Sequence, residues 1–383
     1  MRNINIHVYP SDMKHESRIL RETKFISELN IVNSIIIIGI HKDDLDEYTQ
    51  IDDAIRIWRV VLRTRLLPNN IIGKIIKYTE WILKIFIKFK SQSVAFVNCH
   101  SLSSLPIGIL FKIFFGSKII YDTHELETET QGMTGLKKIL AKILEKFLIN
   151  YTNRVIVVSE SIAKWYKKQY NLKNVYIIKN IPCSKNALDR KSNIFKKKFH
   201  IKNDEILFIY QGMLSNGRGI NLLLNAFSKV EKNKHIVFMG YGEFKEDIEK
   251  YVKHFSNIHI QSPVNPEKIL NYTKSADVGI SIIENICLSY LYCLPNKLFE
   301  YIQSGLPTIV SNFPDMSLII DNYGCGWKTS VNEKSIINTI KNISKKDLLK
   351  KRNKARKCRN ILTWQNESKK LLKIYKNLTL PKS

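Results

Sequence analysis

The chain has 383 residues, of which 44% are hydrophobic and 10% aromatic, a composition that supports packed cores and excludes long disordered segments. This length predicts two domains. The 61 Lys and Arg residues face only 34 Asp and Glu residues, and the formal net charge of +27 predicts polyanionic partners: nucleic acid, anionic lipid headgroups or diphosphate-bearing substrates.

Three further features narrow the class of protein. The cysteines are scattered without the spacing of a disulfide framework or a zinc site. The N-terminal segment is too polar for a signal peptide, and no segment contains about 18 uninterrupted apolar residues. Basic and aromatic residues do not interleave as in RNA-binding motifs. We therefore expect a cytoplasmic protein that does not bind nucleic acid.

Strands and helices alternate through the first half of the chain, as in a doubly wound α/β sheet. Several expected strands are almost wholly apolar, which is typical of parallel strands covered on both faces. The expected strands are 4–9, 33–40, 93–98, 118–122, 153–160 and 175–183, and the expected helices are 17–29, 105–115 and 136–149.

Residues 71–90 form a separate amphipathic helix. Four lysines of this helix, Lys74, Lys77, Lys84 and Lys88, lie within roughly 80° of one another at helical spacing. Two interpretations are open: the apolar side packs on the sheet of its own domain, or the helix attaches to an anionic membrane surface. Complete burial of the helix would exclude the second interpretation.

The expected strand 118–122 runs directly into Thr123-His124-Glu125. Ligands of parallel sheets bind beyond the carboxyl ends of the strands, which makes His124 a candidate site residue. A histidine at such a position is also commonly a hydrogen-bonded structural residue. Glu125, Glu127 and Glu129 follow in a loop, where we expect solvated side chains.

A polar, lysine-rich segment after Pro182 marks a domain boundary, with a linker at 183–200. The same alternation of strands and helices then restarts. Its first strand, 205–210, leads into a glycine-containing loop, 211–218, that includes Gly212 and ends at Arg218 beside a helix start. The forked donors of an arginine suit a diphosphate.

The most specific stretch is SYLYCLPNKLFEYIQSGLPTIVS, residues 289–311. Pro295 fits the first turn of a helix, so the N–H groups of Asn296, Lys297 and Leu298 point out of the helix start and form an anion site that includes a lysine. Glu300 follows about one turn later and is placed to accept hydrogen bonds from a ribose diol. An isolated Lys-x-x-Glu pair is usually just solvated, but the complete run indicates a nucleotide site.

Three stretches resemble motifs of GT-B glycosyltransferases of family 4 (glycosyltransferase group 1, polysaccharide-biosynthesis type): the PNKLFEY run, the YDTHE string and the loop GMLSNGRG. The resemblance implies two Rossmann-like doubly wound α/β domains that face one another across a cleft. Residues 1–182 would form the acceptor-side domain and 201–361 the nucleotide-sugar domain, with a terminal helix in 362–383 that crosses back to the first domain.

The resemblance also implies roles for single residues. Catalysis would involve His124, Arg218 and Lys297, and nucleotide-sugar binding would involve Gly212, Arg218, Asn296, Lys297, Leu298 and Glu300. The expected reaction is transfer of a hexose from a nucleoside diphosphate sugar, with retention at the anomeric carbon, to a lipid-linked or other glycan acceptor. No metal or other cofactor is required, because the cations and helix-start amides stabilise the departing diphosphate.

The implied setting is the assembly of a surface polysaccharide, capsule or lipopolysaccharide, with the enzyme peripheral on the inner face of the cell membrane. Two positions depart from the family pattern. Met213 stands where many relatives carry a basic residue, and Tyr292 stands where many carry the first glutamate of a paired motif. Three alternatives stay open. One is a sugar-nucleotide epimerase, which shares the GT-B fold, and another is a non-catalytic relative that acts as a binding partner, which the tyrosine in place of a glutamate allows. The third is a nucleic-acid binder, which the net charge of +27 favours but which no recognisable RNA motif supports.

Overall fold

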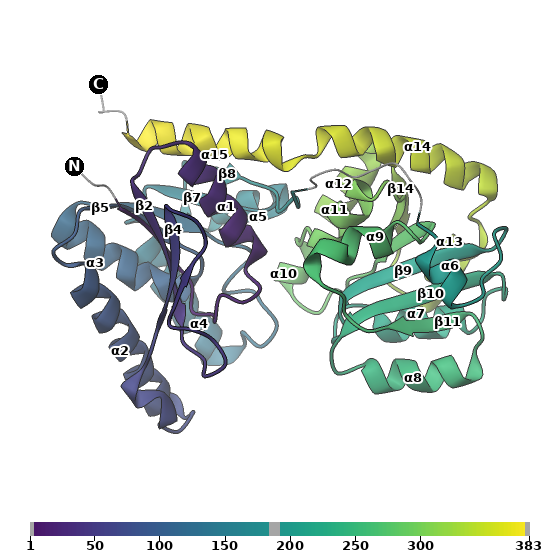
Figure 1. Cartoon of the computed structure of the whole chain (residues 1–383), viewed down its shortest axis with the longest axis horizontal. Coiled ribbons are helices and arrows are strands. Elements are labelled where there is room, and N and C mark those ends of the chain that lie inside the picture. The colour runs from purple at the N-terminus through teal and green to yellow at the C-terminus, as the bar shows by residue number, and fades with distance from the viewer. Residues whose placement is uncertain (1–3, 184–191, 380–383) are drawn as a thin grey trace. The chain divides into compact units, whose positions relative to one another are not determined.

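The computed structural model describes residues 4–183 and 192–379, which belong to two compact units. Unit 1 comprises Met1–Ile178 and Ser368–Ser383, and unit 2 comprises Lys179–Glu367. Each unit contains one sheet covered by helices, labelled in Figure 1. Within the described ranges, no helix is both long enough and apolar enough to cross a bilayer.

Unit 1 has eight strands in the order β3-β4-β2-β1-β5-β6-β7-β8. All neighbouring pairs are parallel except β3 with β4. The apolar runs form the strands because both faces of the sheet are covered. The strands are β1 (Ile4–Val8), β2 (Ser34–Ile40), β3 (Tyr48–Gln50), β4 (Ile55–Val60), β5 (Val94–Cys99), β6 (Lys118–Asp122), β7 (Arg154–Val157) and β8 (Val175–Ile177).

The long helices of unit 1 connect these strands, and the last helix of the chain joins the unit from Ser368 onward. Ser159 caps its helix as its position before the apolar periodicity predicts, since its hydroxyl accepts a hydrogen bond from the N–H of Ile162 at 3.4 Å. The helices are α1 (Ser17–Glu28), α2 (Ile71–Phe89), α3 (Leu105–Phe115), α4 (Gly135–Ile149), α5 (Glu160–Tyr170) and α15 (Trp364–Thr379).

Unit 2 has six parallel strands in the order β11-β10-β9-β12-β13-β14. This is the Rossmann order, in which the chain winds outward from the middle of the sheet in both directions. The strands are β9 (Ile206–Met213), β10 (Lys234–Tyr241), β11 (Ile258–Gln261), β12 (Val278–Ser281), β13 (Thr308–Ser311) and β14 (Gly326–Thr329).

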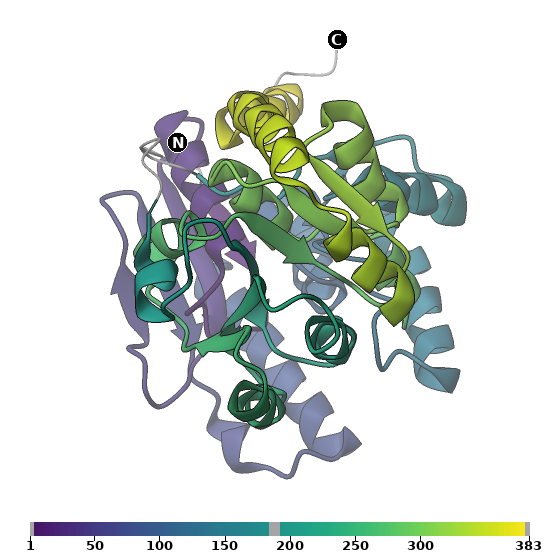
Figure 2. The same ribbon diagram turned by 90° about the vertical axis from the view of Figure 1, so that its right-hand side faces the viewer.

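Helices lie on both faces of this second sheet (Figure 2), and a separate apolar core fills the space on each side. Phe208 and Phe227 belong to one core, and Ile209 and Tyr301 belong to the other. The helices are α6 (Ile194–Lys198), α7 (Ile220–Phe227), α8 (Lys245–His254), α9 (Ile269–Thr273), α10 (Leu288–Leu291), α11 (Asn296–Gln303), α12 (Pro314–Tyr323), α13 (Glu333–Lys341) and α14 (Lys345–Ile361).

The structure differs from the expected elements in several places. The strand expected at 175–183 ends at Ile177, and the hairpin β3–β4 was not predicted. Of the expected linker 183–200, residues 184–191 lie outside the described residues, and the rest includes α6. The contact-based division places the first change of unit after Ile178.

Each sheet has one place where the strand order reverses. In unit 1 this place lies between β1 and β5, and in unit 2 it lies between β9 and β12. Ligands of open α/β sheets bind beyond the carboxyl ends of the strands at such a reversal. The two strand-end clusters described next lie at these positions.

Candidate functional site

The glycine loop of unit 2 lies beside Lys297. Gly212 has a φ of 115°, a value that glycine adopts without strain, and a Cβ added there would lie 3.9 Å from Cε of Lys297. Gly212 lies in the last part of β9, which extends to Met213 and so includes the first residues of the expected loop. The end of β9 and the start of α11 are far apart in sequence, yet they meet at this point. The structure thus brings together two of the residues predicted to bind the nucleotide sugar.

Lys297 is a buried cation, with only 9% of its surface exposed. Its Nζ lies 3.8 Å from the centroid of the Tyr210 ring and makes no hydrogen bond to any residue that the structure describes. Burial, and then the charge of Arg218, lower the pKa of Lys297 to about 7, against an opposing contribution from Glu300. An ammonium in such surroundings favours an anionic ligand, which would supply the missing acceptors.

Arg218 follows the glycine loop and is the second cation of this cluster. Its guanidinium stacks over the Tyr290 ring at 4.6 Å, and within the described part of the chain its buried Nε has no hydrogen-bond partner. The N–H of Gly219, just before α7, donates to Glu284 at 3.1 Å. The N–H of Gly219 is therefore already hydrogen-bonded to a carboxylate, and Arg218 is the group of this loop that could bind an anion.

The start of α11 differs from the predicted anion site in two respects. Pro295 is the N-cap, with φ −72° and ψ 144°, and does not belong to the first turn. The N–H of Leu298 is not free, because it donates to the carbonyl oxygen of Pro295 at 3.1 Å, and its side chain is fully buried. No side chain in the described ranges caps this helix. Of the three predicted amides, those of Asn296 and Lys297 are the ones left to bind an anion.

Glu300 is held by a short chain of hydrogen bonds. Its carboxylate accepts from Nε2 of Gln211, whose Oε1 accepts from the hydroxyl of Thr273 at 2.7 Å. The N–H of Gln211 also donates to the hydroxyl of Tyr301 at 3.0 Å. Gln211 therefore fixes the predicted ribose acceptor next to Gly212, a role that the sequence alone did not reveal.

The strand-end cluster of unit 1 is organised around Asp122. Its Oδ2 lies 3.5 Å from Nε2 of His124 and 3.1 Å from Nδ1 of His100. Arg18 donates to both of its oxygens, at 3.1 and 2.8 Å. Burial opposes the charge on Asp122, but Arg18 and the two histidines hold its pKa well below the ordinary value. His124 keeps 24% of its side chain exposed, so its ring reaches the surface.

A buried polar chain continues inward from this cluster. Nε2 of His100 lies 2.9 Å from Nδ1 of His7, whose Nε2 lies 3.3 Å from the amide nitrogen of Asn5. Burial lowers the pKa of His100 to about 4, so its ring is neutral. With its single proton on Nδ1 facing Asp122, its Nε2 accepts from His7.

Histidines at the ends of three strands carry this chain, and sequence analysis singled out only His124. The signal that could have revealed the others is their position, since His7 lies in β1 and His100 directly follows β5. The chain extends to the last helix, where the hydroxyl of Tyr375 donates to Asn98 at 2.8 Å, and Asn98 donates to Asn5 at 2.6 Å.

His100, Asp122 and His124 also have the spacing of a metal site, with ligand atoms within 4.8 Å of one another. A metal would have to compete with Arg18, which already donates to both oxygens of Asp122. Two opposite charges in direct contact favour a hydrogen-bonded role for the carboxylate. The expectation that no metal is required stays a prediction.

Two of the three glutamates after His124 are not solvated as predicted, since Glu129 is buried and Glu127 is half-buried. Glu129 is buried and accepts from Lys138 and Lys142 at 2.6 and 2.5 Å. Glu127 accepts from the N–H of Leu102 at 3.3 Å, and burial, together with nearby glutamates, raises its pKa to about 8. The prediction holds for Glu125, whose side chain is exposed.

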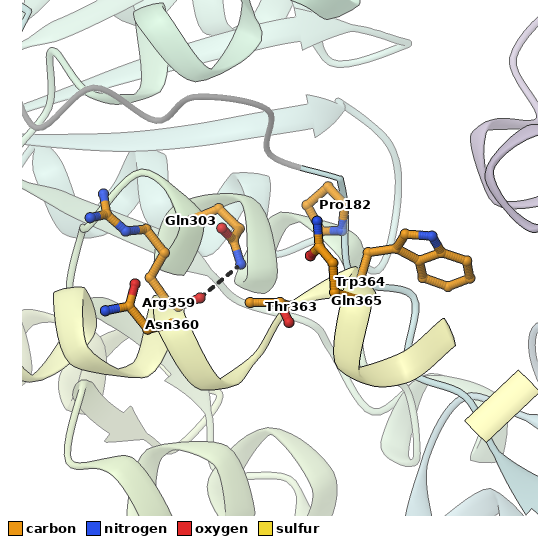
Figure 3. Close-up of a pocket in the computed structure, with 7 residues that line it drawn as sticks. All are labelled: Pro182, Gln303, Arg359, Asn360, Thr363, Trp364 and Gln365. Carbon is orange, nitrogen blue, oxygen red and sulfur yellow. Dashed lines mark hydrogen bonds between the residues drawn. The ribbon is translucent and has the colours of Figure 1, made fainter. Parts of the chain in front are cut away.

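A separate pocket in unit 2 lies where α14 leads into α15 (Figure 3). Its volume is about 240 Å³, below the range of about 300 to 1,000 Å³ that is typical of ligand sites. The amide of Gln303 donates to the carbonyl of Leu362 at 2.5 Å beside it. None of the predicted site residues is among its lining residues, which are Pro182, Gln303, Arg359, Asn360, Thr363, Trp364 and Gln365.

Comparison with known proteins indicates which ligand the buried cations Arg218 and Lys297 bind. The family described as glycosyl transferases group 1 matches residues 191–360, a range that contains Arg218, Lys297 and Glu300. A chitobiosyldiphosphodolichol beta-mannosyltransferase from Kluyveromyces lactis is 22% identical over 353 residues, which cover 83% of this chain and 77% of the relative. Residues 191–360 therefore belong to the group 1 glycosyltransferases, and the chain is a glycosyltransferase.

Two further comparisons agree with this assignment. The amylovoran biosynthesis glycosyltransferase AmsD from Erwinia amylovora is 26% identical over 215 residues, or 55% of each chain. The sucrose-phosphate synthase of Thermosynechococcus elongatus has a TM-score of 0.81 at 12% identity, over 98% of this chain and 99% of that chain. The glycosyltransferase has the GT-B fold, which confirms the prediction of two Rossmann-like α/β domains, and it transfers a sugar from a nucleotide sugar.

Proposed function

We propose that this glycosyltransferase transfers a hexose, with retention of anomeric configuration, from a nucleoside diphosphate sugar to a lipid-linked glycan. The reaction would belong to the assembly of a surface polysaccharide, capsule or lipopolysaccharide on the inner face of the cell membrane. The name of AmsD, which refers to amylovoran biosynthesis, supports the polysaccharide setting. The name of the K. lactis relative, which contains a diphosphodolichol, supports a lipid-linked acceptor.

The observation that carries the proposed donor site is the buried Nζ of Lys297, which lacks a hydrogen-bond partner among the described residues and lies beside Gly212. Arg218 contributes a second charge, and its effect on the pKa of Lys297 indicates that the two cations interact. A diphosphate supplies several acceptor oxygens and two negative charges, and so satisfies both groups at once. The amides of Asn296 and Lys297 add donors from the start of α11.

In this mechanism the bond between the anomeric carbon and the diphosphate oxygen breaks, and the acceptor oxygen bonds to the same carbon on the same face. As the new bond forms, the proton of the acceptor hydroxyl passes to the departing diphosphate oxygen on the same face. Lys297 and Arg218 stabilise the negative charge that develops on the diphosphate, which is preorganised electrostatic catalysis. Glu300 accepts hydrogen bonds from the ribose and fixes the nucleotide.

We assign His124 to the transfer step and Asp122 to its orientation. A hydrogen bond from Nε2–H of His124 to Asp122 leaves Nδ1 as the acceptor on the exposed side of the ring. Asp122 is itself fixed by Arg18, so the imidazole is held in one orientation without a ligand. Asp122 is thus a positioning residue.

The first experiment is a thermal-shift panel of UDP, GDP, ADP and CDP and their sugar conjugates on the wild type and on Glu300→Ala. A ligand at about 100 times its dissociation constant adds about 2.7 kcal/mol, which corresponds to several degrees. We expect one base to stabilise the wild type and to have little effect on Glu300→Ala. Glu246→Ala on α8, an exposed glutamate, is the matched control and keeps the full shift.

A second experiment tests the acceptor and the stereochemistry. The wild type, the donor sugar found by the panel and a short-chain polyprenyl diphosphate sugar are incubated, and the new anomeric proton is read by NMR. An α product from an α-linked donor supports retention, whereas a β product contradicts it. Transfer only to water or to free sugars would contradict the lipid-linked acceptor.

A further inference from the structure

Helix α4 presents its apolar side outward. Six apolar side chains are between 46% and 77% exposed: Leu136, Ile139, Leu140, Ile143, Leu144 and Phe147. At helical spacing they lie within roughly 140° of one another, on the side opposite the buried Glu145. An ordinary surface helix has the reverse arrangement, with the apolar side on the core.

Helix α2 shows the same inversion. Ile72, Ile76, Leu83 and Ile87 are between 42% and 68% exposed, and they lie within roughly 60° of one another at helical spacing. The opposite side carries Trp81 and Ile85, which are buried. The sequence left two interpretations of this helix open, packing on the sheet or attachment to a membrane. The structure is compatible with both, because the helix packs one apolar side on its unit and exposes another.

The two helices belong to one face of unit 1. Helices α2, α3 and α4 connect β4 to β5, β5 to β6 and β6 to β7, and all three crossovers run in the same direction along the sheet. Right-handed crossovers in one direction lie on one face. Helix α3 contacts both of the others (Figure 1). Its side chains Ile113 and Phe114 are exposed.

The charges on these helices are almost all positive. Helix α2 carries four lysines, α3 one and α4 four, while the three helices contain only two carboxylates. Both carboxylates are engaged inside the unit: Glu80 accepts from two backbone N–H groups at 2.7 and 2.9 Å, and Glu145 accepts from three tyrosine hydroxyls. Lys137 and Lys146 flank the apolar stripe of α4 on its two sides.

We propose that the outward side chains of α2, α3 and α4 form one docking surface for an anionic lipid bilayer. The apolar side chains enter the interfacial region, and the flanking lysines contact lipid phosphates, the arrangement of an interfacial amphipathic helix. The inference rests on the proposed function and deepens it, since it names the surface that brings the enzyme to a lipid-linked acceptor. It does not depend on catalysis and is measured without it.

The test is flotation of the full chain with vesicles of phosphatidylcholine, with and without phosphatidylglycerol. We expect the wild type to bind the anionic vesicles, and Leu140→Ser/Phe147→Ser to bind at least about tenfold more weakly, because two apolar side chains leave the interface. The matched control is Leu349→Ser/Ile361→Ser on α14, where the native side chains are 59% and 53% exposed. The control pair should bind as the wild type does.

A charge-reversal pair separates lipid phosphates from a purely apolar contact. Lys137→Glu/Lys146→Glu should bind anionic vesicles at least about tenfold more weakly. Lys232→Glu/Lys253→Glu in unit 2, which changes the net charge equally at exposed positions, should bind as the wild type does. Thermal unfolding of each variant checks that unit 1 remains folded.

Three outcomes would overturn the docking surface. The wild type fails to bind anionic vesicles, or each control loses binding as its test pair does, or gel filtration shows a dimer that Leu140→Ser/Phe147→Ser converts to a monomer. In the last case the face joins two copies of the chain. A failure of docking leaves the nucleotide-dependent thermal shift intact, whereas a failure of the proposed function abolishes that shift and leaves vesicle binding unchanged.

Discussion

The two sheets place polar side chains at equivalent positions, beyond the carboxyl ends of the strands where the strand order reverses. The two clusters differ in whether their buried charged groups have hydrogen-bond partners. In unit 1, the carboxylate of Asp122 accepts from Arg18 and lies beside two histidines, so its charge has several partners. In unit 2, Nζ of Lys297 and Nε of Arg218 are buried without a hydrogen-bond partner among the described residues.

This difference indicates different functions for the two clusters. A buried carboxylate with several hydrogen-bond donors contributes to the stability of its unit and holds a side chain such as His124 in one orientation. A buried cation without acceptors lowers stability, and it gains most when an anion arrives. We therefore expect the cluster of unit 1 to orient His124 and the cluster of unit 2 to bind the diphosphate. Substitutions in each cluster test this division.

Lys297→Met removes the buried ammonium and keeps the length of the side chain. We expect kcat/KM to fall by about 100- to 1,000-fold, as when one preorganised charge-stabilising group is lost. The free energy of unfolding without nucleotide should stay equal or rise, because no hydrogen bond is lost and a desolvated charge disappears. Steady-state kinetics and urea unfolding measure the two effects.

The matched control is Lys234→Met. Lys234 is also buried, but its Nζ donates to the carbonyls of Ile340 and Lys341 at 2.8 and 2.7 Å. Its loss should lower the free energy of unfolding by about 1 to 3 kcal/mol and leave kcat/KM unchanged. If Lys297→Met instead lost stability and kept activity, the idea of a cation held ready for an anion would be wrong.

Asp122→Asn tests the satisfied cluster of unit 1. Removal of the carboxylate charge takes away the group that accepts from Arg18 through both of its oxygens and leaves Glu22 as the remaining carboxylate beside Arg18. We expect a loss of about 2 to 4 kcal/mol in the free energy of unfolding. Asp321→Asn, which breaks the exposed pair with Lys328, should cost less than about 1 kcal/mol. Urea unfolding of both variants distinguishes them, and equal costs would contradict a structural role for Asp122.

The pKa of Lys297 predicts how donor binding depends on pH. The nucleotide-free group titrates near 7, so it is charged below that pH and must take up a proton to bind a diphosphate above it. Donor affinity should be flat in acid and fall by up to about tenfold per pH unit above neutrality. Calorimetry at about pH 8 in two buffers of different ionisation enthalpy detects the proton. Identical enthalpies in both buffers would exclude the uptake.

The same pKa has a consequence for stability without nucleotide. The folded value of about 7 lies below the ordinary value of 10.5, so the unfolded chain binds more protons between these limits. The contribution of Lys297 to the free energy of unfolding therefore rises with pH across this window. The Lys297→Met variant should lack this rise, and a wild type and variant with parallel pH profiles would contradict it.

The elements around Lys297 were predictable because their signals are local. A proline, a lysine and a glutamate in one short run predict the start and polar side of α11, and apolar runs predict the strands on either side. The hydrogen bond from Leu298 to Pro295 was not predictable, because it depends on whether the proline lies before or inside the first turn.

The histidine chain and the docking surface depend on tertiary structure. His7 and His100 meet only because β1 and β5 pair, and their separation in the sequence carries no signal of this pairing. Periodicity predicts that α4 has an apolar side, but it does not say whether that side faces the core or the solvent. The general rule would have placed Leu140 and Phe147 inside, whereas both are more than half exposed.

A substitution at Met213 should have the smallest effect, because it adds a charge to the cluster of unit 2 and removes no hydrogen bond or existing charge. The side chain is 51% exposed and follows Gly212. Met213→Lys adds a third cation at an exposed site, and we expect nucleotide affinity to rise by about two- to fivefold at low salt. Stability should change by less than about 0.5 kcal/mol.

Leu349→Lys adds the same charge on α14, at a side chain that is 59% exposed, and serves as the control for net charge. Nucleotide affinity, measured by calorimetry for both variants at two salt concentrations, should rise only for Met213→Lys. If both variants bound more tightly by the same factor, the gain would follow from the net charge of the chain. The two cations already present would then meet the needs of the diphosphate, because a third charge beside Gly212 would contribute no more than a distant one.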